Sequence, residues 1–271
     1  MLVFVSQTAD YIFPATALIL QDKLGFSNSC MAFDISMGCS GYIYGLSVIG
    51  SIVTQGSLKR GILLVGDTIS KTCSKEDNST YPLFGDAGTA PAIEYDLGKI
   101  GIKFNLSSDG KDFKAIRIED GGFRNQVSSN SFKVNGYDKE IKRNRLQIDL
   151  DGRNVFSFGI TRAPQSIMEL ICEYDLDINT IDYFIFHQAN LFMNEMIRQK
   201  LKLRKRKVPY SLKYFGNTSS AAIPLTLAHA LRKRLITKRH SVILCGFGVG
   251  LLWGSAHLFL DRIKSLEIVE I

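Results

Sequence analysis

The sequence predicts an α/β protein made of two similar halves, each built around a parallel β-sheet covered on both faces. Short apolar segments, typical of buried strands, alternate with longer segments that have the apolar spacing of helices. The same order of segments occurs twice. Gln7 and Gly66 in the first half lie 180 residues before His187 and Gly246 in the second. A repeat at one offset indicates a duplicated unit.

The first half alternates regularly from its first residues. An apolar strand is expected at residues 2–7 and a helix at residues 14–24. The strand, helix and strand that follow are expected at residues 31–36, 39–55 and 62–66.

The second half contains the same elements and two more before them. A strand is expected at 145–150 and a helix at 155–174, ahead of the repeated elements at 183–188, 191–203, 208–215, 219–235 and 242–246. Counterparts of the first two elements would fall before residue 1. We therefore expect the first half to lack its opening strand and helix. That loss would expose apolar sheet surface unless upstream residues or another chain cover it.

Three regions follow from this pattern. They are a truncated N-terminal half (1–100), a polar and basic connecting segment (101–150) and a C-terminal half (151–271). Part of the connection, with Lys139, Lys142, Arg143 and Arg145, is expected to be solvated. The segment is interpreted either as a lid over a pocket or as a surface excursion.

The composition is that of an ordinary soluble globular protein. The chain has 271 residues, of which 45% are hydrophobic and 22% charged. It shows no membrane-spanning run and no signal peptide, and its five scattered cysteines indicate reduced thiols in the cytoplasm. The scattered histidines argue against a metal site. The net charge of +7 and the basic run at 204–207 fit a solvated face or an acidic partner better than nucleic acid.

Cys39 is the main candidate for chemistry. It lies between the apolar run 31–35 and the helix-like segment 43–53, and therefore at a strand-to-helix turn. Unpaired N–H groups at the start of a helix favour a thiolate over a thiol, so a cysteine at this place is suited to act as a nucleophile. A small buried residue beside the glycines of a tight turn is the alternative interpretation.

His187 and Asn217 occupy equivalent junctions in the second half. Each is expected at the end of a strand and before a helix, as Cys39 is. Ligands collect at the carboxyl ends of strands in open α/β sheets, so these three side chains are expected to meet at one site. Taken singly, a buried core histidine and a helix N-cap are the alternative interpretations of His187 and Asn217.

These residue types suit a condensation through an acyl-cysteine. The thiolate would attack an acyl thioester, and His187 and Asn217 would donate hydrogen bonds to the enolate oxygen formed when CO₂ leaves. The resulting carbanion would attack the acyl-cysteine. Its oxyanion would be held by the Cys39 N–H and by an N–H from the loop 246–250, which contains Gly248 and Val249.

The segments that carry these residues resemble the β-ketoacyl-acyl carrier protein synthase III family of thiolase-fold condensing enzymes. The resemblance covers nearly the whole chain. It rests on residues 34–41, 84–88, 187–190, 216–219, 246–250 and 253–255.

The resemblance implies a thiolase-like five-layered αβαβα fold, a homodimer and a catalytic triad of Cys39, His187 and Asn217. It implies acyl-CoA as primer, malonyl-acyl carrier protein as extender, and a 3-oxoacyl-acyl carrier protein of fatty acid or related biosynthesis as product. No cofactor is expected. Phe13, in a Phe-Pro loop that reaches the partner's pocket, and Phe247 are expected to contact substrate.

The chain departs from the family in three places. The family has a further segment before the position of Leu2, in agreement with the missing strand and helix. Phe192 replaces an arginine that helps to dock the acidic carrier protein, and Arg198 and Lys200 on the same helix are expected to compensate. Val249 replaces a glycine, and its N–H can serve only if its φ is allowed for a β-branched residue.

Other functions remain as alternatives. A papain-like hydrolase shares the order Cys, His, Asn, but it needs no duplicated α/β unit and would carry a signature that this sequence lacks. A relative of the same fold could pass the acyl group to an amine or a hydroxyl. A truncated subunit could be inactive and only pair with an intact synthase.

Overall fold

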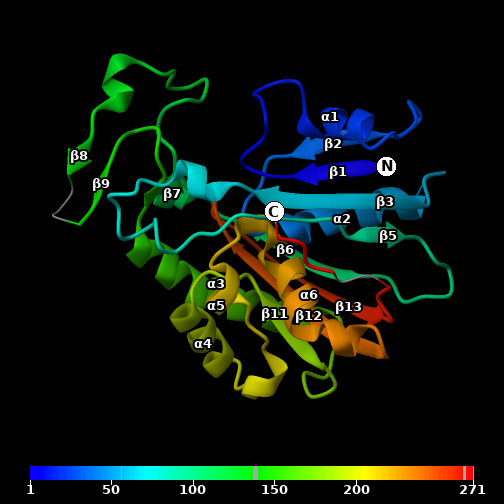
Figure 1. Cartoon of the computed structure of the whole chain (residues 1–271). Coiled ribbons are helices and arrows are strands. Elements are labelled where there is room, and N and C mark those ends of the chain that lie inside the picture. The colour runs from blue at the N-terminus through cyan, green and yellow to red at the C-terminus, as the bar shows by residue number, and fades with distance from the viewer. Residues whose placement is uncertain (56, 137–139, 265–266, 271) are drawn as a thin grey trace.

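The computed structural model describes residues 1–55, 57–136, 140–264 and 267–270 and contains two large β-sheets (Figure 1). The first sheet has the order β2-β1-β3-β4, with β5 also paired to β3. The second sheet has the order β11-β12-β13-β6. The strands of the first sheet are β1 (Leu2–Val5), β2 (Ala32–Ile35), β3 (Arg60–Asp67), β4 (Ala87–Thr89) and β5 (Ala92–Glu94). Those of the second are β6 (Lys103–Ser108), β11 (Tyr183–Phe186), β12 (Arg239–Gly248) and β13 (Leu252–Asp261).

Helices and short strand pairs complete the chain. The helices are α1 (Thr16–Lys23), α2 (Gly41–Gln55), α3 (Gly152–Glu173), α4 (Leu191–Lys200), α5 (Leu212–Phe215) and α6 (Ala222–Leu235). Short 3-10 helices cover Ile69–Thr72, Gly110–Ala115, Ser129–Phe132, Lys205–Lys207 and Ser219–Ala221. Two small antiparallel pairs join β7 (Ile116–Arg117) to β10 (Asp149–Leu150) and β8 (Asn135–Gly136) to β9 (Lys142–Arg143).

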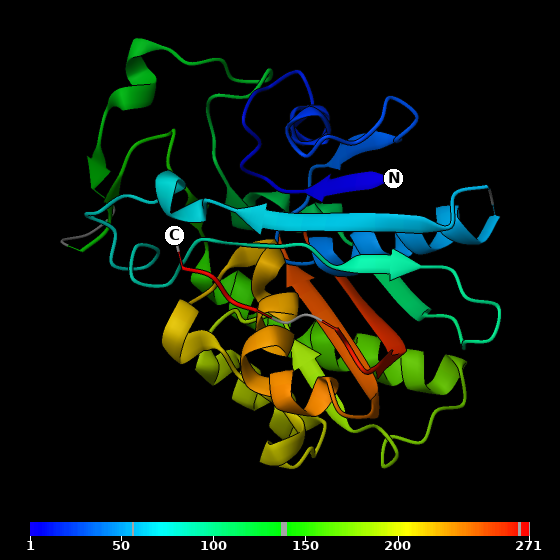
Figure 2. The same cartoon turned by 45° about the vertical axis from the view of Figure 1, so that its right-hand side comes forward.

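The helices divide the molecule into five layers, αβαβα. Helices α2 and α6 lie between the sheets, where Leu46 of α2 and Leu227 of α6 share one core with Val3 and Ile185. Helices α3 and α4 pack on the outer face of the second sheet, and α1 packs on β1 and β2 on the outer face of the first (Figures 1 and 2). This confirms the predicted layered architecture.

The repeated strands follow the predicted ranges with one shift. In the first sheet Val3 lies opposite Leu63, and in the second Tyr183 lies opposite Val242. Because paired residues of parallel strands point to the same face, β1 corresponds to β11 at an offset of 180 residues and β3 to β12 at 179. The second sheet is also less parallel than expected, since β13 runs antiparallel to both of its neighbours, β12 and β6.

The strand expected at 208–215 is not formed. Residues 212–215 are the short helix α5, and the residues before it are in no strand. Pro209 has no N–H to give to a ladder, and the N–H of Ser211 donates instead to the side chain of Gln188 at 3.0 Å. The strand expected at 145–150 is also shorter, because only Asp149 and Leu150 are paired.

The connecting segment 101–150 is more integrated than its composition suggests. Its first part, β6, pairs with β13 and is therefore an edge strand of the second sheet. Arg143, expected to be solvated, is buried and forms ion pairs with Asp77 and Asp149, because two carboxylates replace the lost hydration. Lys139 lies outside the described residues.

Within the part of the chain that the structure describes, no helix combines the length and apolar character that a membrane span needs.

Candidate active site

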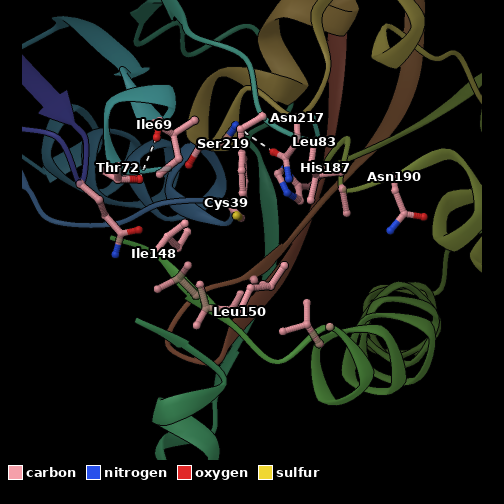
Figure 3. A pocket seen from close by; sticks show the side chains of 18 of the residues that line it. Cys39, Ile69, Thr72, Leu83, Ile148, Leu150, His187, Asn190, Asn217 and Ser219 are labelled. Carbon is pink, nitrogen blue, oxygen red and sulfur yellow. Dashed lines mark hydrogen bonds between the residues drawn. The ribbon is translucent and has the colours of Figure 1, made fainter. Parts of the chain in front are cut away.

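A cavity of about 290 Å³ lies where the two halves meet, and it is lined by Cys39, His187 and Asn217. Cys39 stands between β2 and α2, and His187 directly follows β11. The structure therefore brings together the three side chains selected from the sequence. Figure 3 shows the sulfur of Cys39 between the side chains of His187 and Asn217 on one side of the view and those of Ile148 and Leu150 on the other.

Cys39 is held against the end of β12. A Cβ atom at Gly248 would lie 2.4 Å from the Cβ and 2.8 Å from the Sγ of Cys39, so only a glycine permits this approach. The close contact places the backbone of Val249 beside the thiol, where it hydrogen-bonds to the sulfur. Cys39 is 8% exposed, so a substrate must reach its sulfur through the cavity.

Burial dominates the electrostatics of the thiol. It raises the pKa of Cys39 to about 11, although hydrogen bonds from the Val249 backbone and the Ser219 side chain oppose the shift. The direction of this shift is opposite to the one expected from the start of α2. Desolvation of the charged form outweighs the hydrogen bonds that would stabilise it.

His187 is a neutral imidazole in this environment. Burial lowers its pKa to about 3, and contact with the Ser219 backbone only partly opposes the shift. The ring packs edge-on against Phe247, with centroids 5.6 Å apart. The backbone N–H of His187 donates to the Cys245 carbonyl at 2.8 Å, which ties the residue to β12. A neutral imidazole carries one N–H and can donate a single hydrogen bond.

Asn217 has its amide orientation fixed by a local hydrogen bond. Its Oδ1 accepts the N–H of Ser219 at 3.0 Å, which leaves the Nδ2 group as the remaining donor. Its backbone N–H and C=O bond to Leu83 and Gly85 at 2.9 and 3.0 Å. A Cβ at Gly85 would lie 2.1 Å from the Phe215 carbonyl, so this glycine makes the contact possible. Tertiary contacts, and not a preceding strand, therefore place Asn217.

The backbone of Val249 has a φ that a β-branched residue can adopt, as the sequence analysis required. Val249 is not among the described non-glycine residues with positive φ, so its backbone is allowed for a β-branched side chain. The backbone N–H groups of Cys39 and Val249 both face the sulfur of Cys39.

Asp67 is a site residue that the sequence did not single out. It is buried at the end of β3 and accepts hydrogen bonds from the Ser6 hydroxyl (3.0 Å), the Gln7 N–H (2.7 Å) and the Ser220 N–H (3.2 Å). Gln7 and Ser219 both line the cavity. This carboxylate therefore links the first half to the loop that carries Asn217. Its position at the end of the third strand of the first half could have identified Asp67 from the sequence as a site residue.

Apolar side chains form the wall opposite the donors. Ile69 and Ile116 line it together with Ile148 and Leu150, and the last three come from the connecting segment. The segment predicted to be a lid or an excursion thus supplies part of the cavity wall.

The other predicted residues lie in different places. Phe247 is 2% exposed and lines the cavity, whereas Phe13 is 80% exposed and does not. Arg198 is ion-paired with Glu195 at 2.8 Å and donates to the Leu203 carbonyl, so its guanidinium is committed inside the protein and the expected docking role is not supported. Lys200, at the end of α4, donates to the Ile160 carbonyl on the surface.

Two models of one protein family match the chain. The first, described as 3-oxoacyl-[acyl-carrier-protein (ACP)] synthase III, matches residues 33–110. The second, described as the C-terminal part of the same synthase, matches residues 171–259.

Curated relatives agree with this assignment. The chain is 33% identical over 257 residues to a beta-ketoacyl-[acyl-carrier-protein] synthase III of Clostridium tetani, covering 94% of this chain and 76% of the relative. It is 35% identical to the synthase III of Caldanaerobacter subterraneus subsp. tengcongensis, with 94% and 75% covered.

Solved structures also resemble the fold. A crystal structure of a 3-oxoacyl-(acyl-carrier-protein) synthase III superposes with a TM-score of 0.91 at 30% identity, covering 96% of this chain and 77% of that chain. The corresponding synthase of Burkholderia xenovorans superposes with a TM-score of 0.89 at 37% identity, with 98% and 74% covered.

Proposed function

The chain belongs to the 3-oxoacyl-[acyl-carrier-protein] synthase III family, and we propose that its cavity joins an acyl group to malonyl-acyl carrier protein with loss of CO₂. An acyl-CoA supplies the acyl group, Cys39 carries it, and a 3-oxoacyl-acyl carrier protein is released. The observation that supports this function best is a thiol beside two neutral hydrogen-bond donors in one mainly apolar cavity.

The first step transfers the acyl group to Cys39. The sulfur attacks the thioester carbonyl, and the oxyanion accepts hydrogen bonds from the N–H groups of Cys39 and Val249. The C–S bond to coenzyme A then breaks, and the coenzyme A thiolate takes up the proton that Cys39 loses. Because the thiol has a raised pKa, this proton leaves as the sulfur attacks and not before.

The second step forms the carbon nucleophile. Malonyl thioester loses its carboxylate as CO₂, and the electron pair moves onto the thioester oxygen as an enolate. His187 and the Nδ2 group of Asn217 donate hydrogen bonds to this oxygen. Fixed neutral donors in a water-poor cavity stabilise the developing charge strongly, because they need no reorganisation.

The third step makes the carbon–carbon bond. The enolate carbon attacks the acyl-Cys39 carbonyl, whose oxyanion again bonds to the two N–H groups. The bond to sulfur breaks, the product leaves, and Cys39 regains a proton. As proposed, the reaction uses only the side chains and backbone of the protein and its two thioester substrates, without a cofactor.

Condensation is favoured over acyl transfer to an amine or a hydroxyl. Simple acyl transfer has no enolate and needs no second donor, whereas Asn217 is oriented by two neighbouring segments so that its amide remains a donor. The relatives carry the name of the condensing synthase.

The assembly is proposed to be a cytoplasmic homodimer that receives the acidic carrier protein on a basic surface. Phe13 is exposed and outside the cavity of its own protomer, in keeping with a role in the partner's pocket. Lys200 ends α4 about 15 Å along the helix from Asn190, which lines the cavity. Its positive charge would assist encounter with an acidic partner.

Acylation followed by intact mass measurement tests the function. The purified protein is incubated with butyryl-CoA, and we expect one added butyryl group that disappears in Cys39→Ala. Cys172→Ala is the matched control, since Cys172 is exposed and outside the cavity, and it should be labelled as the unchanged protein is. Addition of malonyl-acyl carrier protein should then release CO₂ and discharge the adduct. A label that persists in Cys39→Ala would overturn the assignment of the nucleophile.

A further inference from the structure

The backbone N–H of Val249 faces the Cys39 sulfur, and its side chain also lines the cavity. We propose that its isopropyl group makes the enzyme select acyl groups that are unbranched next to the carbonyl, in a cavity that accepts a straight chain longer than acetyl. This inference rests on the function proposed above and concerns the acyl group of the same site.

The backbone of Val249 fixes the place of its side chain relative to the thiol. Its N–H bonds to the Cys39 sulfur, and Gly248 allows this approach because even a Cβ there would lie 2.8 Å from that sulfur. The side chain of Val249 therefore starts from a backbone that is in contact with the Cys39 sulfur, the atom that carries the acyl group.

The same side chain faces the apolar wall. Val249 packs against the cluster that contains Ile69, Ile116 and Ile148, and all four residues line the cavity. Its isopropyl group is thus part of the apolar cavity wall and belongs to the residue whose backbone contacts the thiol.

An acyl group on Cys39 must pass this isopropyl group. Its carbonyl oxygen bonds to the N–H of Val249, so the next carbon atoms of the chain lie beside the Val249 side chain. A straight chain presents one methylene at each position, whereas a branch at the second carbon adds a methyl where the space is taken. Overfilling a packed apolar site is unfavourable, and one methyl group changes the selectivity of such pockets roughly 10- to 200-fold.

The size of the cavity indicates a chain beyond acetyl. Its volume is about 290 Å³, compared with the roughly 150 Å³ of an engineered apolar cavity that binds benzene. The cavity of one protomer therefore has room for an unbranched chain longer than acetyl.

Two isomeric substrates test the inference without a change in acyl size. Butyryl-CoA and isobutyryl-CoA have the same molecular formula and differ only in branching at the second carbon of the acyl group. The rate at which each acylates Cys39 is measured by quenched-flow mass spectrometry, with acetyl-CoA and octanoyl-CoA as probes of length. We expect butyryl to react at least tenfold faster than isobutyryl, and octanoyl to be accepted.

Variants of Val249 assign the selectivity to its side chain. Val249→Ala should reduce the butyryl-to-isobutyryl ratio about tenfold, whatever the absolute rates, and Val249→Thr, which keeps the shape, should restore it. Val134→Ala makes the same deletion at an exposed residue outside the cavity and should leave the ratio unchanged.

The outcomes separate this inference from the function on which it rests. Equal rates for the two isomers, or an unchanged ratio in Val249→Ala, would overturn the role of Val249 and leave the acyl-cysteine mechanism standing. Acylation by acetyl-CoA, with no reaction of either butyryl-CoA or octanoyl-CoA, would overturn the proposed acceptance of a chain longer than acetyl. Absence of an adduct with every thioester would overturn both the proposed function and this inference.

Discussion

The two sheets of the molecule are alike on their inner faces and different on their outer faces. Phe184 of β11 and Ile243 of β12 pair on the outer face of the second sheet and are 0% exposed, because α3 and α4 cover them. Phe4 of β1 and Leu64 of β3 pair at the corresponding place in the first sheet and are only partly buried. Among the described helices, α1 alone packs on that face.

This difference shows which parts of a duplicated fold the site depends on. The inner faces share one core with α2 and α6, and that core determines how the strand ends meet. The less covered half supplies Cys39, and the fully covered half supplies His187 and Asn217. The first half therefore supplies the proposed nucleophile and the second half the proposed side-chain donors, and variants can test each of these roles alone.

The largest expected effect comes from the donors of the second half. His187→Ala or Asn217→Ala should lower the rate of CO₂ release from malonyl thioester roughly 10²- to 10³-fold, the usual loss when one oxyanion donor is removed. Acylation of Cys39 should persist, because that step uses the backbone N–H groups of Cys39 and Val249 and neither of these two side chains. Release of CO₂ is followed with labelled malonyl thioester and acylation by intact mass. Decarboxylation that survives both changes would contradict the assigned roles.

A second, smaller effect compares the outer faces directly. Phe184→Ala should reduce the free energy of unfolding by about 3–5 kcal/mol, since it opens a cavity in a fully buried layer. Phe4→Ala removes the same side chain from a partly covered layer, and we expect roughly half of that loss. Urea denaturation of both variants measures the difference. Equal losses would show that the two faces are covered to the same degree in solution.

The pH dependence of the thiol sharpens the comparison at the site. Because burial raises the pKa of Cys39 to about 11, the thiolate fraction rises nearly tenfold for each pH unit from 7 to 9. Alkylation of Cys39 by iodoacetamide in a Cys172→Ala background should rise accordingly. His187, with a pKa lowered to about 3, stays neutral throughout this range and adds no inflection. A plateau near neutral pH would mean that the thiolate is already formed.

The smallest effect concerns the surface of α4. Lys200→Ala should raise the KM for malonyl-acyl carrier protein by at most about fivefold, as exposed charges contribute little individually. Arg198→Ala should lower stability instead, because Glu195 loses its ion-pair partner. Steady-state kinetics at two salt concentrations distinguish these effects. A larger KM effect in Arg198→Ala than in Lys200→Ala would restore the docking role that the structure does not support.

Much of the site was predictable because it lies at chain junctions. Cys39 and His187 follow apolar strands, and strand ends in an α/β sheet meet at one edge. The pattern of the duplicated elements placed them without any knowledge of contacts. Asn217 lines the same cavity, but the strand expected before it is absent, and backbone bonds to Leu83 and Gly85 hold it instead.

The sequence by itself determined the duplicated α/β layers and the identity of the three polar side chains, because hydrophobic periodicity and junction residues are local properties of the chain. Only the tertiary structure decided the protonation of the site and the shape of its cavity. Burial from many segments reverses the expected shift of the Cys39 pKa, Asp67 joins loops from both halves, and the connecting segment forms part of the apolar wall. Desolvation and cavity shape depend on which distant residues pack together, so neither can be read from local pattern.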